Sequence, residues 1–253
     1  MRRVLVTGGS RGIGRAVAVA FAEHGDRVAV HYNSDADAAD RTRRLLPGTG
    51  HTTIAGDLDD PDAALQVAEA AVSALGGIDV LVNNAAVATS AATRHAVTEV
   101  DYAQWQQIWQ QMINVNLLGA VHLSYAVARH LIDRGAAGRI VNIGSRGAFR
   151  GEPDFPAYAS SKAALHAFGQ SMAVALAPHG IAVASVAPGF ISTERQEAKL
   201  ASDAGDAVRA QSPFGRVGTP DEVAAAVLYL ASANAEWASG AVLDLNGASY
   251  LRT

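Results

Sequence analysis

The sequence has no cysteine and almost no lysine. Without cysteine, the chain of 253 residues has no disulfides, no thiolate metal site and no thiol nucleophile. Among its 20 basic residues only Lys162 and Lys199 are lysines, and the others are arginines. Most of this bias is compositional and says little about individual arginines. It does single out the two lysines as positions to examine.

Excess positive charge and long apolar runs are also missing. The formal net charge of −4 gives no basic surface for nucleic acid or an anionic membrane. The most apolar stretch, residues 163–191, is interrupted by polar residues, Pro178 and Gly180, so it predicts no membrane span. The short apolar run at residues 4–6 passes directly into a glycine turn, unlike a signal peptide. We therefore expect a cytoplasmic protein with no nucleic-acid or membrane partner.

Short apolar runs alternate with helical patterns along the chain, with no repeat or linker between them. Continuous Val, Ile and Leu runs are typical of parallel strands buried on both faces. The pattern predicts one α/β domain over residues 1–253: a doubly wound, Rossmann-type, mostly parallel sheet of seven strands with helices on both faces. The strands are expected at residues 4–6, 27–31, 52–55, 79–82, 139–143, 182–187 and 241–245, and the helices at 12–24, 35–46, 61–75, 102–133, 158–177 and 221–230.

A glycine-rich loop joins the first predicted strand to the first helix. Glycines let the backbone turn sharply and approach a pyrophosphate, and the helix N-terminus offers free N–H groups. The spacing Gly-x-x-x-Gly-x-Gly differs from the commoner Gly-x-Gly-x-x-Gly, and a plain tight turn is the alternative. We expect a dinucleotide to contact Gly8, Ser10, Arg11, Gly12, Ile13 and Gly14.

The adenosine side of the predicted site favours NADP(H) over NAD(H). The second strand runs into Asn33 and Ser34, without the acidic residue that would bind the ribose 2′-hydroxyl of NAD. Arg11 is available for a 2′-phosphate, unless it only faces solvent. Asp35 could fold back to the ribose, which keeps NAD open. Asp57, after the third strand, is placed to accept from the adenine amino group, or it is only a helix N-terminal charge.

Ser145, Tyr158 and Lys162 form a candidate catalytic set. Ser145 follows the fifth strand, and Tyr158 and Lys162 lie four residues apart, on one face of a predicted helix. An ammonium beside a phenol favours the phenolate, so we expect Lys162 to lower the Tyr158 pKa from its usual value of about 10. Such a pair by itself is more often an exposed helix contact.

The combined motifs resemble the single-domain branch of the short-chain dehydrogenase/reductase family, in the style of 3-oxoacyl-(acyl-carrier-protein) reductase-like NADPH ketoreductases. The resemblance covers essentially the whole chain. Besides the glycine loop, Ser145 and the Tyr158-x-x-x-Lys162 pair, it rests on Asp57-Leu58, Asn83-Asn84-Ala85-Ala86, Asn114-Val115-Asn116, Pro188-Gly189-Phe190-Ile191-Ser192-Thr193, and residues 214–222. It departs from the family at Ala86, where glycine is usual, and at Asn246-Gly247-Ala248, where Asp-Gly-Gly is usual.

The resemblance implies hydride transfer between NADP(H) and a carbonyl or secondary alcohol. Tyr158 would be the general acid and base, and Ser145 would bind the substrate oxygen. Lys162 would bind the nicotinamide ribose and lower the Tyr158 pKa, and Asn116 would position a water in a proton relay. The residues implied at the cofactor, besides the glycine loop, Asn33, Ser34 and Asp57, are Leu58, Asn84, Ala85, Ala86, Tyr158, Lys162, Pro188, Gly189, Ile191 and Thr193.

The substrate is expected to be a small carbonyl or alcohol. Reductases that dock acyl carrier protein usually present arginines where this chain has Ala136 and His179, although a 3-oxoacyl thioester stays open. Phe149, Phe155 and Phe190 are candidates for the pocket wall, with core packing as an equal alternative. Residues 192–212 are interpreted as a mobile substrate lid.

Other expectations concern assembly and competing functions. The histidines lack ligand spacing, so no catalytic metal is predicted. The resemblance implies a homotetramer. A non-catalytic NADP-binding regulator on the same fold is the alternative function, but such proteins typically lose Tyr158 or Lys162. Enoyl reductases of the family space these two residues more widely, which disfavours double-bond reduction.

Overall fold

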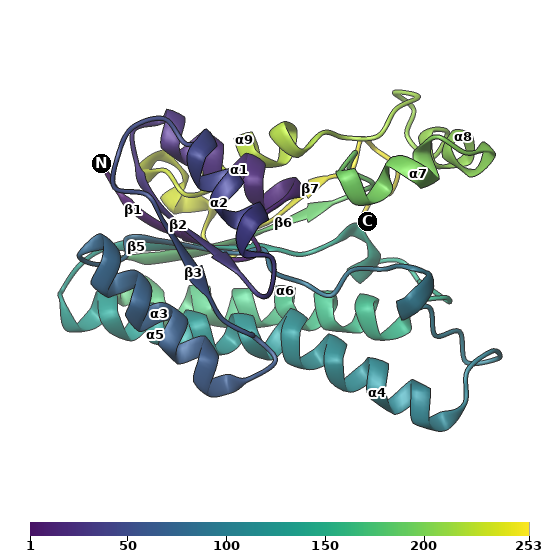
Figure 1. The fold of residues 1–253 in the computed structure, drawn as a ribbon, viewed down its shortest axis with the longest axis horizontal. Helices are drawn as coiled ribbons and strands as arrows, with labels where there is room; N and C mark the ends of the chain where they lie inside the picture. Colours follow the sequence, from purple (N-terminus) through teal and green to yellow (C-terminus); the bar gives the residue numbers. More distant parts are fainter. Residues whose placement is uncertain (253) are drawn as a thin grey trace.

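The computed structural model describes residues 1–252, except for the Lys199 side chain. Within them lies one seven-stranded parallel sheet with the order β3-β2-β1-β4-β5-β6-β7, which confirms the predicted doubly wound fold (Figure 1). The order reverses between β1 and β4, where such folds leave a crevice at the carboxyl ends of the strands. The strands are β1 (Arg3–Val6), β2 (Arg27–Tyr32), β3 (Thr52–Ala55), β4 (Val80–Asn83), β5 (Gly138–Ile143), β6 (Ile181–Pro188) and β7 (Val242–Leu245).

Helices cover both faces of the sheet (Figure 1). On one side lie α1 (Gly12–Glu23), α2 (Ala36–Leu45) and α9 (Pro220–Leu230). On the other side lie α3 (Pro61–Leu75), α4 (Tyr102–Ile113), α5 (Gly119–Asp133) and α6 (Pro156–Leu176). Two short helices, α7 (Glu197–Leu200) and α8 (Asp203–Arg209), fall within the predicted lid.

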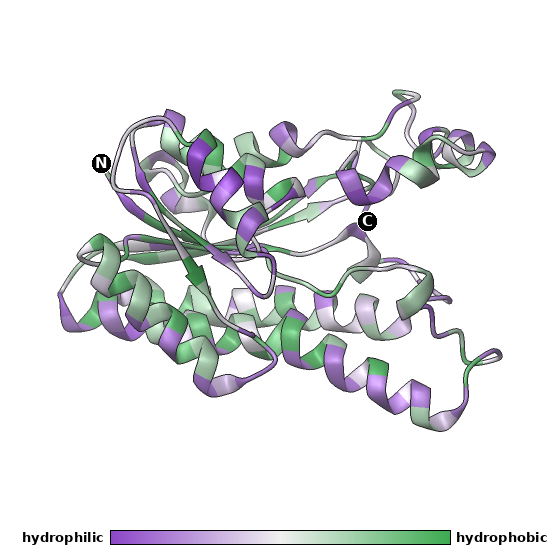
Figure 2. Cartoon of the chain, viewed as in Figure 1, coloured by the Kyte–Doolittle hydropathy of each residue, from purple (hydrophilic) through white to green (hydrophobic). Residues whose placement is uncertain are grey.

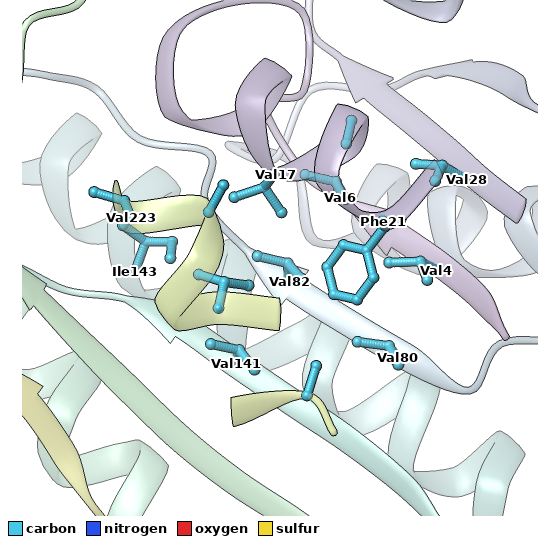
Figure 3. Packing of buried hydrophobic residues seen from close by; sticks show 14 of the residues in the cluster. Val4, Val6, Val17, Phe21, Val28, Val80, Val82, Val141, Ile143 and Val223 are labelled. Carbon is cyan, nitrogen blue, oxygen red and sulfur yellow. The ribbon is translucent and has the colours of Figure 1, made fainter. Parts of the chain in front are cut away.

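The alternation of side chains along each strand divides the core into two layers. Val4 and Val6 pack with Phe21 of α1 on one face, whereas Leu5 between them packs with α3 and α5 on the other. Figure 3 shows the first layer, in which Phe21 lies among valines of β1, β2 and β4. In Figure 2 the strands are largely hydrophobic, while the helices are hydrophilic on their outer turns. The five inner strands therefore have no exposed face, as their continuous apolar runs predicted, whereas the edge strands β3 and β7 are partly exposed.

The long helix expected at residues 102–133 has an internal irregularity. A π-helical turn, Asn114–Leu118, joins α4 to α5. π-Bulges inside helices often occur at functional sites. This one places Asn116 inward, 1% exposed. In the described part of the chain, no helix is long and apolar enough to cross a membrane.

Candidate active site

A cavity of about 1050 Å³ opens at the carboxyl ends of the strands, where the strand order reverses. Its wall combines the glycine loop, the ends of β2 to β6 and the predicted lid. Of the residues predicted at the cofactor, substrate or acid–base step, Ser34, Asn116 and Phe149 do not line it. Those that do are Gly8, Ser10, Arg11, Gly12, Ile13, Gly14, Asn33, Asp57, Leu58, Asn84, Ala85, Ala86, Ser145, Phe155, Tyr158, Lys162, Pro188, Gly189, Phe190, Ile191 and Thr193.

The glycine loop is folded tightly against its neighbours. Gly8 has φ +60°, which favours glycine, and a Cβ on Gly14 would lie 2.2 Å from the Gly8 carbonyl oxygen. The Asn84 carboxamide donates to the carbonyl oxygens of Thr7 at 2.8 Å and Gly8 at 3.1 Å. Asn84 thus ties the end of β4 to the loop, in addition to lining the cavity.

His31, at the end of β2, braces the same loop and was missed by the sequence analysis. Its Nδ1 accepts the Gly8 N–H at 3.2 Å, and its Nε2 lies 3.0 Å from the Gly56 carbonyl oxygen. Burial lowers the pKa of His31 to about 4, so the ring is neutral at pH 7. A neutral ring with Nε2 protonated makes both bonds, accepting at Nδ1 and donating at Nε2. The available signal was a lone polar residue in a buried apolar strand.

The N-terminus of α1 binds an anionic oxygen in this structure. The side chain of the N-cap residue, Arg11, makes no capping hydrogen bond, and the first turn of α1 contains no acidic residue. Instead Glu194 reaches over from the lid segment, accepting the Gly12 N–H through Oε2 at 3.2 Å and pairing with Arg15 through Oε1 at 2.7 Å. The Glu194 carboxylate stands where a phosphate oxygen would be expected. These residues therefore fit the pyrophosphate of a dinucleotide.

On the adenosine side, the carboxylate nearest to the end of β2 is engaged elsewhere. Asp35 caps α2 by accepting the Ala38 N–H at 2.9 Å. Arg11 is exposed and, like Asn33, lines the cavity, whereas Ser34 is exposed outside it. Asp57 also lines the cavity and accepts the Asp59 N–H at 3.0 Å. No carboxylate at the end of β2 is therefore directed to a ribose.

Ser145, Tyr158 and Lys162 meet in one part of the cavity. Ser145 begins the 3-10 turn Arg146–Ala148, and its Oγ accepts the Gly147 N–H at 3.0 Å. The Ser145 side chain is also close enough to the Tyr158 phenol to lower its pKa. The Lys162 ammonium donates to the Ile143 carbonyl oxygen at 2.9 Å and lies 5.9 Å from the centre of the Tyr158 ring.

The electrostatics of this trio differ from the sequence expectation in one respect. Burial raises the pKa of Tyr158, and it outweighs the opposing effects of the nearby Ser145 and Arg195 side chains. The net shift is therefore opposite to the expected lowering, because desolvation of the phenol dominates in this structure. The ammonium is itself desolvated: Lys162 is 2% exposed, and burial lowers its pKa to about 8. The phenol is thus protonated at pH 7, and the lysine titrates close to neutrality.

Asn116 lies beneath the cavity and links two walls. Its Oδ1 accepts the Val87 N–H at 2.7 Å. Its Nδ2 donates to the Val87 carbonyl oxygen and to the Ser161 hydroxyl, both at 3.2 Å. The π-helical turn thereby holds the segment after β4 against α6, next to Lys162.

The three candidate phenylalanines occupy different places. Phe155 and Phe190 line the cavity. Phe149 instead stacks on His166, with ring centroids 5.1 Å apart, and Arg252 lies over its ring. Of the predicted lid, residues 193–196, 198 and 211 reach the cavity wall.

Comparisons with known proteins agree with this geometry. A family model described as "Enoyl-(Acyl carrier protein) reductase" matches residues 8–247. The chain is 36% identical to the 3-oxoacyl-[acyl-carrier-protein] reductase FabG of Vibrio cholerae, covering 98% of this chain and 96% of that protein. It is 35% identical to an L-rhamnose 1-dehydrogenase (NAD(P)(+)) of Sphingomonas sp. strain SKA58, covering 99% and 96%. Among solved structures, a short-chain dehydrogenase from Burkholderia cenocepacia in complex with NADP is similar, with a TM-score of 0.86, 32% identity and coverage of 98% and 97%.

Proposed function

The chain belongs to the short-chain dehydrogenase/reductase family and is an oxidoreductase, and we propose that Ser145, Tyr158 and Lys162 perform its acid–base chemistry on a small carbonyl or secondary alcohol. The observation that carries this proposal is the meeting of these three side chains in a cavity that also contains the glycine loop. A dinucleotide along the loop and a substrate at Ser145 would share that cavity.

In the reducing direction, a nicotinamide held in this cavity would supply the hydride for the carbonyl carbon. The Ser145 hydroxyl donates a hydrogen bond to the carbonyl oxygen as negative charge develops there. Tyr158, which is protonated at pH 7 because burial raises its pKa, gives its phenolic proton to the same oxygen. Lys162 then stabilises the phenolate electrostatically. Oxidation of an alcohol uses the same groups in reverse.

NADP(H) is the proposed cofactor, in preference to NAD(H). The absence of a free carboxylate at the end of β2 removes the repulsion that a 2′-phosphate would meet, because Asp35 is engaged as the cap of α2. Arg11 supplies a guanidinium at the edge of the cavity for that phosphate. The similar Burkholderia structure contains NADP, whereas the similar rhamnose dehydrogenase is described as using NAD(P)(+).

A homotetramer in the cytoplasm completes the proposal. Exposed apolar side chains on α4, α5 and α6 support subunit contacts there: Tyr102 is 72% exposed, Tyr125 62% and Val174 79%. The cytoplasmic location rests on the sequence alone. Residues 192–212 are proposed to be the substrate lid, since part of this segment forms one wall of the cavity.

The test is NADPH oxidation by the purified protein with a panel of ketones, aldehydes and 3-oxoacyl thioesters, followed at the nicotinamide absorbance. We expect turnover of small carbonyls, and faster turnover with NADPH than with NADH. Turnover of carrier-bound thioesters alone would instead support the thioester reductase. Binding of NADPH without turnover of any carbonyl or alcohol would contradict the proposal and favour a non-catalytic regulator.

A further inference from the structure

Arg146 is a buried cation beside the proposed catalytic serine. It follows Ser145 directly, is 5% exposed, and forms part of the cavity wall. Reduction of a carrier-bound thioester or of an uncharged ketone gives no role to a positive charge at the position of Arg146. The side chain was not singled out by any motif.

The charge of Arg146 is not neutralised by the protein. Among residues 1–252, no carboxylate forms an ion pair with it. Arg139, which is buried to a similar extent at 8% exposed, pairs with Glu236 at 3.0 Å. Burial and the nearby Arg150 lower the pKa of the Arg146 guanidinium, and the Glu152 carboxylate, which forms no ion pair with Arg146, offsets only part of this lowering. A buried charge without a partner is costly, so its presence requires an explanation.

The surrounding groups hold the Arg146 guanidinium in place with neutral acceptors. Its Nη1 donates to Ser249 Oγ at 2.5 Å, and its Nη2 donates to Gln211 Oε1 at 2.9 Å. The guanidinium also lies 5.4 Å from the centre of the Phe190 ring. Ala248, which precedes Ser249, has φ +57° and is the one non-glycine residue with positive φ within residues 1–252. The C-terminal turn therefore accepts backbone strain where it holds the arginine.

Other charges on the same wall do not neutralise this position. Arg150 pairs with Glu152 at 3.7 Å. Arg195, from the lid, is close enough to lower the pKa of Tyr158. Arg146 is thus a buried arginine in the cavity wall whose guanidinium has five N–H groups, more than its bonds to Ser249 and Gln211 use.

We propose that Arg146 binds the carboxylate of the substrate, which is therefore a short oxo acid or the corresponding hydroxy acid. The inference rests on the proposed function of Ser145 and Tyr158. An arginine recognises a carboxylate through two parallel hydrogen bonds, and in a desolvated site this interaction is strong and directional. Arg146 and Ser145 line the same cavity, and so does Phe190, near whose ring the guanidinium lies, so that one substrate can contact both side chains.

This placement distinguishes the proposed substrate from an acyl thioester. The thioester group is neutral, and a carrier-bound substrate has its charges on the distant phosphates of the prosthetic arm. A fixed cation in the wall of the substrate cavity would have no partner in the acyl part of such a substrate, and its desolvation would be uncompensated.

The experiment compares the α-, β- and γ-keto isomers of pentanoate with their methyl esters, using NADPH and the full-length protein. We expect at least one acid to exceed its ester about 10-fold or more in kcat/KM, as a charge-assisted bond implies. In Arg146→Gln, kcat/KM for the acid should fall about 10- to 100-fold, mainly through a higher KM, while kcat/KM for the ester should change less than about threefold. Arg150→Gln removes a charge from the same wall and should leave the acid-to-ester ratio within about threefold.

A binding measurement accompanies the kinetics, because the keto acid and NADP+ form a complex that cannot react. Calorimetric titration of the preferred keto acid into the NADP+-saturated protein should show a matching loss of affinity in Arg146→Gln. Equal losses for acid and ester in this variant, or a wild type that reduces the esters as well as the acids, would overturn the carboxylate assignment and leave the proposed function intact. No turnover of any carbonyl would overturn both.

Discussion

Lys162 should destabilise the folded protein, although the proposed reaction requires it. Lys162 is 2% exposed and has no carboxylate partner among residues 1–252; its ammonium donates a hydrogen bond to the Ile143 carbonyl oxygen at 2.9 Å. Burial lowers its pKa from 10.5 to about 8. Since each pKa unit corresponds to about 1.4 kcal/mol, the charged lysine costs the folded state about 3 kcal/mol at pH 7.

Replacing Lys162 with methionine removes this cost and keeps most of the side-chain volume. The Ile143 carbonyl oxygen loses its hydrogen-bond donor, which reduces the gain in stability by about 1–2 kcal/mol. We therefore expect Lys162→Met to be more stable than the wild type by about 1–2 kcal/mol at pH 7, while losing activity. Urea unfolding at equal protein concentration, followed by tryptophan fluorescence, measures the difference.

The pH dependence gives a second check with a defined sign. Between pH 8 and 10.5 the unfolded lysine holds a proton that the folded one has lost, so wild-type stability rises relative to the variant as pH increases. The advantage of Lys162→Met should shrink by about 2 kcal/mol between pH 7 and pH 9.5. A variant that is less stable than wild type at pH 7, or a difference that does not change with pH, would refute the reasoning.

Three further predictions concern the cofactor side of the cavity. Arg11→Gln should weaken NADPH binding about 10-fold and leave NADH binding unchanged, because one charge-assisted contact to a phosphate is lost; equal effects on both nucleotides in a fluorescence titration would contradict this. Glu194→Gln should tighten NADPH binding several-fold, because it removes the negative charge held at the Gly12 N–H; unchanged or weaker binding would show that this carboxylate does not compete with phosphate. Burial lowers the pKa of His31 from 6.5 to about 4, so between pH 7 and pH 5 the unfolded ring takes up a proton that the folded ring does not. Over this range, the free energy of unfolding of the wild type, measured with urea, should fall by about 2 kcal/mol more than that of His31→Gln. Equal falls in the two proteins would contradict this prediction.

The strands, the sheet and most of the cavity wall were predictable from local sequence. The inner strands are short buried runs, and the glycine loop identifies the first turn between strand and helix. Tyr158 and Lys162 were predictable as neighbours, because helical geometry alone brings positions four residues apart together. These features depend on residues close in the chain.

The features that were missed depend on contacts between distant residues. Arg146 is held by Ser249, 103 positions away, and the Glu194 carboxylate meets Gly12 across 182 positions. The pKa of Tyr158 was predicted in the wrong direction for a related reason: the sequence indicates a nearby ammonium but not how strongly the fold desolvates the phenol. Phe149 packs on His166 instead of lining the cavity, because the turn after Ser145 directs it there.

The central claim is that Tyr158 transfers the proton to the substrate oxygen. The most direct test is Tyr158→Phe, which removes the phenolic oxygen and keeps the ring, measured with NADPH and the best carbonyl of the panel. We predict that NADPH binds the variant as tightly as the wild type, while the rate of carbonyl reduction falls by about 100-fold or more. A variant that binds NADPH and reduces the carbonyl at the wild-type rate would contradict the account.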